Sequence, residues 1–511
     1  MPGRAFVYAQ PEALERPNLD KEAAACAGAH QEQSAGHGGE LDLSSVAAPI
    51  HFIGIGGIGM SAIARLLLAQ GRQVSGSDQH DSEIMRELAD LGAKIYIGHA
   101  AANAKDAGAI VVSTAITASN PELSYAKENG MPVMHRSDLL RCLSQSSKLL
   151  AVSGTHGKTT TTGMISQVLL DCELDPSVVV GGIFARIAAN SRLGQGEYFV
   201  AEADESDRTH GQLTSYMAVI TNIEPDHLEN YPGGMQQIKD VMISFANKTS
   251  FAVVICQDDY ECRAIMHEIQ APKITYGKYN LDLPATYQYE SLAGASMRVY
   301  KGSSVLGEVT LTVPGEHNKL NALAAIAVGC ELGLEFSGIA EALAHFGGVD
   351  RRFQLIGEVN NIIVVDDYAH HPTEVVATLQ GARQYLAQHR TKCGGNSELK
   401  RVVALFQPHQ PSRLRDLWDD FVKAFSGADC VLIADVYVAR GSQIEGITSK
   451  RLVQSITHPD IHYIEGSADQ MAEKVLPYLR SGDLFLTMGA GDVTKVGPKI
   501  VEMLTQGRGH G

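Results

Sequence analysis

The sequence predicts an α/β protein of three domains. At roughly 150 residues per domain, a chain of 511 residues is long enough for three cores. Two separate stretches read as apolar strand, glycine turn and helix, and the last third of the chain alternates apolar strands with helical stretches. We expect an N-terminal extension, a Rossmann-like domain, a central phosphate-loop α/β domain and a C-terminal Rossmann-like parallel-sheet domain, comprising residues 1–48, 49–147, 148–348 and 349–511.

Composition limits the classes of function. Hydrophobic residues make up 44% and charged residues 20%, as in an ordinary soluble protein. The formal net charge of -16 argues against general nucleic-acid binding, which needs a basic surface. The eight cysteines contain no CxxC pair, so neither a zinc site nor a disulfide framework is predicted. Without a signal-peptide core or an apolar run of about 20 residues, stable membrane insertion is not expected and the cytoplasm is the predicted location.

Residues 1–48 are rich in Glu, Gln, His, Ala and Gly and show no sustained periodicity. Such a composition is typical of a flexible extension, and no catalytic role is expected for it. Predicted order begins with the strand at His51, which runs into Gly54-x-Gly56-x-x-Gly59 and a helix. A second strand ends at Asp78, so the segment resembles a Rossmann fingerprint for NAD or another diphosphate nucleotide. Asp78 is predicted either to bind the nucleotide or simply to close the strand.

The strongest local signal is the run from Gly154 to Thr160, which follows an apolar strand and opens a helix. In this layout backbone N–H groups surround a phosphate, Lys158 reaches the outer phosphates and the Thr159 hydroxyl ligates Mg²⁺. The strict Walker pattern has a glycine where Val152 stands here, so the loop is a shortened form. A nucleotide-binding phosphate loop is therefore predicted.

Two further strands end in side chains suited to a metal. One leads to Glu202 and the other to His227. Because ligands in open α/β sheets lie beyond the carboxyl ends of strands, both residues are expected to face the phosphates and hold Mg²⁺ or Mn²⁺. The alternative is that the acid caps a loop and the histidine is packed. Asn318 and Asn321 begin a predicted helix and suit either adenine binding or helix capping.

The C-terminal third repeats the pattern of buried strands followed by polar residues. A strand at 362–365 precedes a cluster that contains His370 and His371, and another strand precedes His409. Continuous apolar strands predict a parallel sheet covered on both faces. The paired histidines suit either a structural or a catalytic role. Residues 347–350 look like the linker into this domain.

Taken in order, these motifs resemble the Mur ligases of bacterial cell-wall synthesis. The resemblance covers residue 49 to the end of the chain. It implies an ATP-dependent ligase that joins the lactyl carboxylate of UDP-N-acetylmuramate to L-alanine. In this chemistry ATP phosphorylates the carboxylate, and the amine then displaces phosphate from the acyl phosphate. The residues that carry the resemblance are 51–60, 154–160, 202–207, 221–227, 317–321, 351–354 and 366–374.

The resemblance also implies roles for individual residues. The implied catalytic residues are Lys158, Glu202, His227, Arg352 and His370. The metal would be held by Thr159, Glu202 and His227. ATP would be bound by Gly154, Thr155, His156, Gly157, Lys158, Thr159, Thr160, Asn318, Asn321, Arg352 and Asp367. The UDP diphosphate would be held by Gly56, Gly57, Ile58, Gly59 and Met60, with Ser77 and Asp78 near the uridine. Tyr368 would close over ATP and the acyl phosphate, and His409 and Arg413 would face the L-alanine carboxylate.

Two departures from the family pattern and three alternatives complete the predictions. Met242 lies near the place where related ligases that add later amino acids carry a carbamylated lysine, so no such modification is predicted here. The family commonly shows an H-R-Y-T-R run, whereas this chain has Gln410 in place of the first arginine. One alternative is a recycling ligase that attaches a whole tripeptide, although the run from Asp366 to Glu374 resembles the alanine-adding enzymes more closely. A nicotinamide-dependent oxidoreductase and a non-catalytic nucleotide-binding protein are the others, and neither uses Lys158, Glu202 and His227 together in catalysis.

Overall fold

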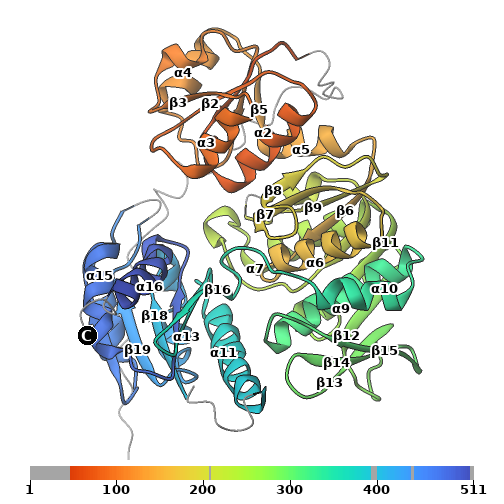
Figure 1. Ribbon diagram of the computed structural model, residues 1–511. Coiled ribbons are helices and arrows are strands. Elements are labelled where there is room, and N and C mark those ends of the chain that lie inside the picture. The colour runs from red at the N-terminus through yellow and green to blue at the C-terminus, as the bar shows by residue number, and fades with distance from the viewer. Residues whose placement is uncertain (1–45, 207–208, 393–399, 439–441, 507–511) are drawn as a thin grey trace, which may run out of the picture. The chain divides into compact units, whose positions relative to one another are not determined.

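The computed structural model describes residues 46–206, 209–392, 400–438 and 442–506. Most of the predicted extension, residues 1–45, therefore lies outside the described residues. Within the described part, the chain has the predicted α/β organisation with three separate sheets (Figure 1). No helix in that part is both long and apolar enough to cross a membrane. The domain boundaries at 148 and 349 stay predictions.

The first sheet has five strands, all parallel, in the order β3-β2-β1-β4-β5. Strand β1 lies between β2 and β4, so the strand order reverses beside it and the glycine turn after β1 faces the crevice where such sheets bind ligands. The Rossmann-like expectation is confirmed. The elements are β1 (Ile50–Ile53), α2 (Ile58–Ala69), β2 (Val74–Asp78), α3 (Glu83–Asp90), β3 (Lys94–Ile97), η2 (Ala101–Ala104), β4 (Ala109–Val112), α4 (Pro121–Glu128), β5 (Val133–His135) and α5 (Arg136–Ser144).

The second sheet has ten strands in the order β15-β14-β13-β12-β11-β10-β6-β9-β7-β8. Its middle is parallel, and both edges turn antiparallel, at β7–β8 and from β13 to β15. Its strands are β6 (Lys148–Ser153), β7 (Ser177–Phe184), β8 (Ala189–Arg192), β9 (Tyr198–Glu202), β10 (Ser215–Ile220), β11 (Thr249–Cys256), β12 (Lys273–Lys278), β13 (Tyr287–Ser291), β14 (Ser296–Lys301) and β15 (Ser304–Thr310). Its helices are α6 (Lys158–Asp171), η3 (Thr209–Gln212), η4 (Leu228–Asn230), α7 (Gly234–Asn247), α8 (Tyr260–Ile265), α9 (Glu316–Glu331) and α10 (Phe336–Ala344).

Helix α6 is buried along most of its length, because it packs against the sheet and against α9 and α10 in one apolar core. The core extends past the predicted linker. Val349 is 3% exposed, belongs to this core and forms an isolated bridge with Phe184. The segment expected to be a simple linker is therefore anchored to the second domain by its apolar side chain.

The third sheet has six strands in the order β16-β17-β21-β18-β19-β20. Strand β16 runs antiparallel to β17, so the predicted parallel sheet carries one antiparallel edge strand. Alternate residues of β17 enter two separate cores, one on each face, which explains its continuous apolar sequence. The elements are β16 (Gln354–Val359), β17 (Ile362–Asp367), α11 (Pro372–Lys392), β18 (Arg401–Phe406), α12 (Pro411–Asp416), α13 (Trp418–Lys423), β19 (Cys430–Ala434), α14 (Ser449–Ser455), β20 (Ile461–Ile464), α15 (Ala468–Val475), η5 (Leu476–Tyr478), β21 (Asp483–Met488), η6 (Asp492–Lys495) and α16 (Val496–Gln506).

Candidate active site

The phosphate loop connects β6 to α6 and needs glycine at two places. Gly154 and Gly157 have φ values of +130° and +81°, which side chains rarely adopt. A Cβ at Gly154 would lie 2.2 Å from Thr221 Oγ1, and one at Gly157 would lie 2.6 Å from Asn321 Oδ1. Both the backbone conformation and the lack of room for a side chain therefore require glycine at these two positions. The loop turns without the additional glycine that the longer Walker pattern has.

Asn222, which follows β10, holds the back of this loop. Its backbone oxygen accepts from the Thr155 N–H at 3.0 Å, and its side-chain oxygen accepts from the His156 N–H at 2.8 Å. Its amide nitrogen donates to the His156 oxygen at 3.0 Å. The N–H groups of Thr155 and His156 are thus hydrogen-bonded to Asn222. The donors that face an incoming anion are those of the first turn of α6, where the helix dipole also favours negative charge.

Lys158 points toward the loop and an acidic partner. Its Nζ donates to the oxygens of Gly154 at 2.7 Å and Thr155 at 3.1 Å, and to Glu205 Oε1 at 2.8 Å. Burial alone would lower the pKa of Lys158, but the charges of Glu205 and Asp204 outweigh it and raise the pKa. The ammonium is therefore cationic and lies at the position from which it can reach a phosphate on the loop.

Glu202 ends β9 directly beside the loop. Its Oε1 accepts from the Gly181 N–H at 2.5 Å, and its Oε2 accepts from Thr159 Oγ1 at 3.3 Å. Burial raises the pKa of Glu202, and the nearby Lys158 offsets this only in part. A partly buried carboxylate with incomplete compensation favours a cation beside it, and Glu202 lies against the hydroxyl predicted to be a metal ligand.

His227 and Arg352 line the same cavity as Thr159. His227 adopts φ +52° and lines the same cavity as Thr159 and Glu202. Arg352, from the start of the third domain, donates from Nη2 to Thr159 Oγ1 at 3.4 Å. Two predicted metal-binding residues are thus in contact, and the third lies on the same cavity wall.

Arg413 is already paired with a carboxylate of the second domain. Its guanidinium donates to Asp226 at 3.0 to 3.2 Å from Nε and Nη2, and the two side chains are 8% and 11% exposed. Nη1 lies 3.4 Å from His409 Nδ1. Burial would raise the pKa of Asp226, but His227 and Arg413 hold it well below its usual value. The arginine predicted to bind the L-alanine carboxylate thus binds a protein carboxylate in this structure.

Glu374 connects the third domain to the loop. Its Oε2 accepts from the N–H groups of His370 and His371, at 3.0 and 3.2 Å, and its Oε1 lies 3.2 Å from His156 Nδ1. Despite burial, Glu374 and Glu224 raise the pKa of His156 to about 9. His370 also bonds the Tyr368 oxygen through Nδ1 at 2.9 Å.

Asp367, Asn318 and Asn321 form hydrogen bonds with other residues of the protein in this structure. The two oxygens of Asp367 accept from the N–H groups of Phe353 and Ala369, each at 2.8 Å. Thr161 donates to Asn321 Oδ1 at 3.2 Å, and Asn321 donates to Asn318 Oδ1 at 3.2 Å, so these amides join α9 to α6. Their predicted contacts with ATP remain predictions.

In the first domain, Asp78 Oδ2 accepts from the Gly56 N–H at 3.0 Å and so shapes the glycine turn. Ser77, expected near the uridine, is fully buried, and its hydroxyl donates to Glu122 Oε2 at 2.5 Å. Glu122 is itself fully buried, which the sequence did not indicate. Arg136, also not predicted, donates from Nη2 to Asp204 Oδ2 at 2.6 Å.

A cavity of about 670 Å³ collects residues from all three domains. The predicted residues that line it are Ile58, Gly59, Thr155, His156, Lys158, Thr159, Glu202, His227, Arg352, Tyr368, His370, His409 and Arg413. Those outside its lining are Gly56, Gly57, Met60, Ser77, Asp78, Gly154, Gly157, Thr160, Asn318, Asn321 and Asp367. Sequence reasoning missed Arg136, Asp204, Glu205, Asp226 and Glu374, which also line the cavity and pair with predicted residues or with each other.

A phosphate loop that faces a partly buried carboxylate, in a cavity shared by three α/β domains, defines a nucleotide-dependent enzyme that acts between domains. Three family models match in sequence order: "Mur ligase family, catalytic domain" at residues 49–148, "Mur ligase middle domain" at 152–329 and "Mur ligase, glutamate ligase domain" at 351–491. The chain belongs to the Mur ligase family.

Individual relatives agree with this assignment. The chain is 42% identical over 462 residues to a UDP-N-acetylmuramate–L-alanine ligase of Pelobacter propionicus, covering 89% of this chain and 98% of that protein. It is 42% identical over 466 residues to the enzyme of the same name from Geobacter sulfurreducens, covering 90% and 98%. The crystal structure of UDP-N-acetylmuramate-alanine ligase from Thermotoga maritima matches with a TM-score of 0.76 and 31% identity, covering 90% of this chain and 99% of that one.

Proposed function

We propose that this chain is an ATP-dependent ligase that joins L-alanine to the lactyl carboxylate of UDP-N-acetylmuramate in peptidoglycan precursor synthesis. The observation that carries the proposal is the shared cavity, where the phosphate loop, Glu202 and the cationic side chains of the third domain meet. The names of the relatives, which align over nearly their whole length, support the choice of substrates.

The residues fit ATP at the phosphate loop. The α6 N-terminus presents backbone donors, Lys158 supplies a charge, and no larger residue could replace Gly157 without meeting Asn321. ATP is consumed in the proposed reaction and is therefore a substrate. Arg352 reaches Thr159 from the third domain, so the proposal gives it a place beside the transferred phosphate.

The residues also fit a divalent cation. Thr159 and Glu202 offer oxygen ligands 3.3 Å apart, and His227 lines the same cavity. When bound there, Mg²⁺ would neutralise charge on the outer phosphates. Glu202 would hold this ion with one oxygen while the Gly181 N–H fixes the other.

In the proposed reaction the lactyl carboxylate takes the γ-phosphate, and the amine of L-alanine then attacks the resulting acyl phosphate. A carboxylate oxygen leaves with the phosphate, so one amide forms for each ATP. The negative charge that develops is stabilised by Lys158 and Arg352. Arg413 would exchange Asp226 for the carboxylate of L-alanine, and His409 lies beside that guanidinium.

Phosphate release from ATP tests the proposal directly. Purified full-length protein is given ATP, Mg²⁺ and UDP-N-acetylmuramate, followed by L-alanine, L-serine, glycine or the tripeptide in separate reactions. We expect release to depend on both the UDP substrate and L-alanine. Release only with the tripeptide would indicate the recycling ligase, and release that ignores every amine would refute the ligase assignment. Binding of ATP without turnover would indicate the non-catalytic alternative.

A further inference from the structure

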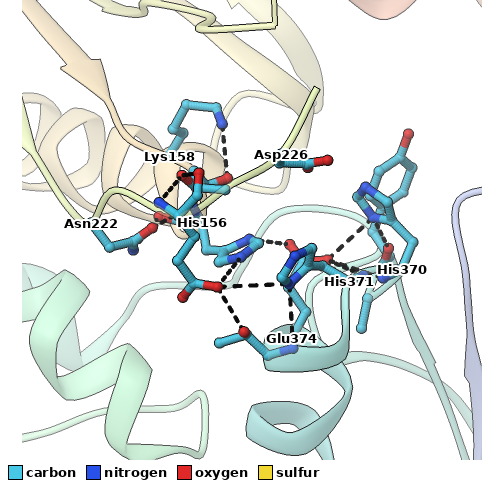
Figure 2. Close-up of polar contacts among 12 residues, drawn as sticks. His156, Lys158, Asn222, Asp226, His370, His371 and Glu374 are labelled. Carbon is cyan, nitrogen blue, oxygen red and sulfur yellow. Dashed lines mark hydrogen bonds and ion pairs between the residues drawn. The ribbon is translucent and has the colours of Figure 1, made fainter. Parts of the chain in front are cut away.

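Three side chains with metal-binding groups meet where the phosphate loop approaches the start of α11. They are His156 of the loop, Glu224 from the segment after β10, and His371 just before α11, and their ligand atoms lie within 4.8 Å of one another. His156 Nε2 is 3.5 Å and His371 Nδ1 is 3.8 Å from Glu224 Oε2. The ring centroids of His156 and His371 lie 4.7 Å apart. Figure 2 shows these two labelled side chains next to each other.

The outer contacts of this group hold its ligand atoms in place. Among the described residues, the buried Nε2 of His156 has no hydrogen-bond partner, while Nδ1 on the other side of the ring lies 3.2 Å from Glu374. Thr373 Oγ1 donates to Glu224 Oε2 at 2.8 Å. A carboxylate behind a ligating imidazole and a hydrogen bond to a ligating carboxylate are the usual outer contacts of a metal site.

The local charge also suits a divalent ion. Glu224 and Glu374 both keep a lowered pKa despite burial, because His156 lies beside each of them and His370 beside Glu374. Burial, followed by the charge of His156, lowers the pKa of His371 to about 4, so its imidazole is neutral at neutral pH. The Nδ1 lone pair of His371 accepts from the Thr373 N–H at 3.3 Å, and a metal ion on Nδ1 would replace this long contact. In the metal-free protein, a proton on His156 compensates only one of the two carboxylate charges. A divalent cation that replaces this proton would compensate them fully.

We propose that His156, Glu224 and His371 form a binding site for a borderline transition metal ion of the Zn²⁺ class, separate from the Mg²⁺ ligands Thr159 and Glu202. Two imidazoles and one carboxylate favour such an ion over Mg²⁺, which prefers oxygen ligands. Zinc bonds of about 2.0 to 2.2 Å place tetrahedral ligand atoms about 3.4 Å apart. The distances of 3.5 and 3.8 Å to Glu224 are close to that geometry. The two histidine ligand atoms lie within 4.8 Å of each other and would have to approach by up to about 1.4 Å.

The site has a consequence for turnover. It joins the phosphate loop to the residues that start α11, so a bound ion ties the second domain to the third. Opening between domains is commonly needed for product release, and Zn²⁺ is therefore expected to inhibit. This inhibition rests on the proposed ligase function, whereas metal binding at the three residues does not.

Cobalt(II) is the probe that tests binding, because its visible absorption reports coordination geometry. Full-length protein is freed of metal with a chelator, returned to buffer with millimolar Mg²⁺, and titrated with Co²⁺. We expect one site with a tetrahedral spectrum that Zn²⁺ abolishes by displacement. His371→Ala and, independently, Glu224→Gln should each weaken Co²⁺ affinity by at least about 100-fold, the upper end of the loss typical for removal of an outer-shell contact, because each removes a direct ligand. Neither residue belongs to the proposed catalytic set, and thermal unfolding of each variant checks its fold.

The matched control is His462→Ala, because Cys430, Asp460 and His462 form the other candidate group in the described residues. This variant should keep the Co²⁺ spectrum and affinity of the parent protein. Equal Co²⁺ affinity in the parent and both site variants would overturn the proposal. So would loss of binding in His462→Ala, or displacement of Co²⁺ by millimolar Mg²⁺.

Discussion

Gly163 in the middle of α6 provides a quantitative test of how the phosphate-loop helix is packed. A Cβ at this position would lie 2.9 Å from Val349 Cγ2 and 3.2 Å from Phe346 Cε2. Valine is stiff at χ1, so its methyl group cannot rotate away easily. Gly163→Ala therefore gains about 1 kcal/mol of helix propensity but loses about 1 to 3 kcal/mol by overpacking. We expect it to be neutral or destabilising by up to about 2 kcal/mol.

Val349→Ala removes the nearer of these two obstacles. Two lost methyl groups at about 0.8 kcal/mol each, with a small cavity, predict a cost of about 2 kcal/mol. In the double variant the new methyl group enters the space that valine leaves. The two changes should therefore be less destabilising together than their sum by at least about 1 kcal/mol.

Urea unfolding followed by far-UV circular dichroism measures these free energies. Trp418, the only tryptophan in the sequence, is in the third domain, and its fluorescence identifies that domain's transition separately. Gly338→Ala in α10 is the control, because its Cβ would meet only Cys172 Sγ at an ordinary 3.5 Å. That change should be additive with Val349→Ala. Additivity of the Gly163 pair within about 0.5 kcal/mol would refute the packing argument.

Three further predictions concern the site. Lys158→Ala should reduce phosphate release at least about 100-fold while calorimetry still detects UDP-N-acetylmuramate binding; joint loss of both in a folded variant would contradict separate sites. Glu202→Gln should raise the Mg²⁺ concentration for half-maximal activity, whereas the exposed Glu473→Gln should not. Burial raises the pKa of Asp367 to about 6, so the stability this group contributes is present below its unfolded pKa near 3.8 and lost as pH rises through 6. Asp367→Asn should flatten that dependence in urea unfolding between pH 3.5 and 7, and an unchanged profile would contradict it.

The strands and the phosphate loop were predictable because their signals are local. Strand β6 is formed by a continuous apolar run. Gly154 and Gly157, which follow it, have positive φ values that residues with a side chain rarely adopt. Such features depend on neighbours within a few positions. The family resemblance extended this to the order of the domains, which three family models confirm.

Contacts between distant residues could not be predicted in the same way. Asp226 and Arg413 are separated by 187 positions, and neither sequence neighbourhood indicates that they pair. Ser77 has the position of a ligand-binding residue at a strand end, but the buried Glu122 of α4 binds its hydroxyl. A buried carboxylate needs hydrogen-bond donors, and Ser77 provides one of those for Glu122. This pairing becomes visible only when α4 is packed against the sheet.

The pairs in the cavity suggest why anionic substrates and a cation would bind together. Lys158 and Arg413 are held by Glu205 and Asp226, so the cations expected to meet anions already have carboxylate partners. A phosphate or carboxylate that takes one of these cations leaves a buried acid without its counter-ion, which is costly. A divalent cation in the same cavity would compensate the released charge. Binding of anionic substrates and of Mg²⁺ should therefore strengthen each other, as reciprocal coupling requires.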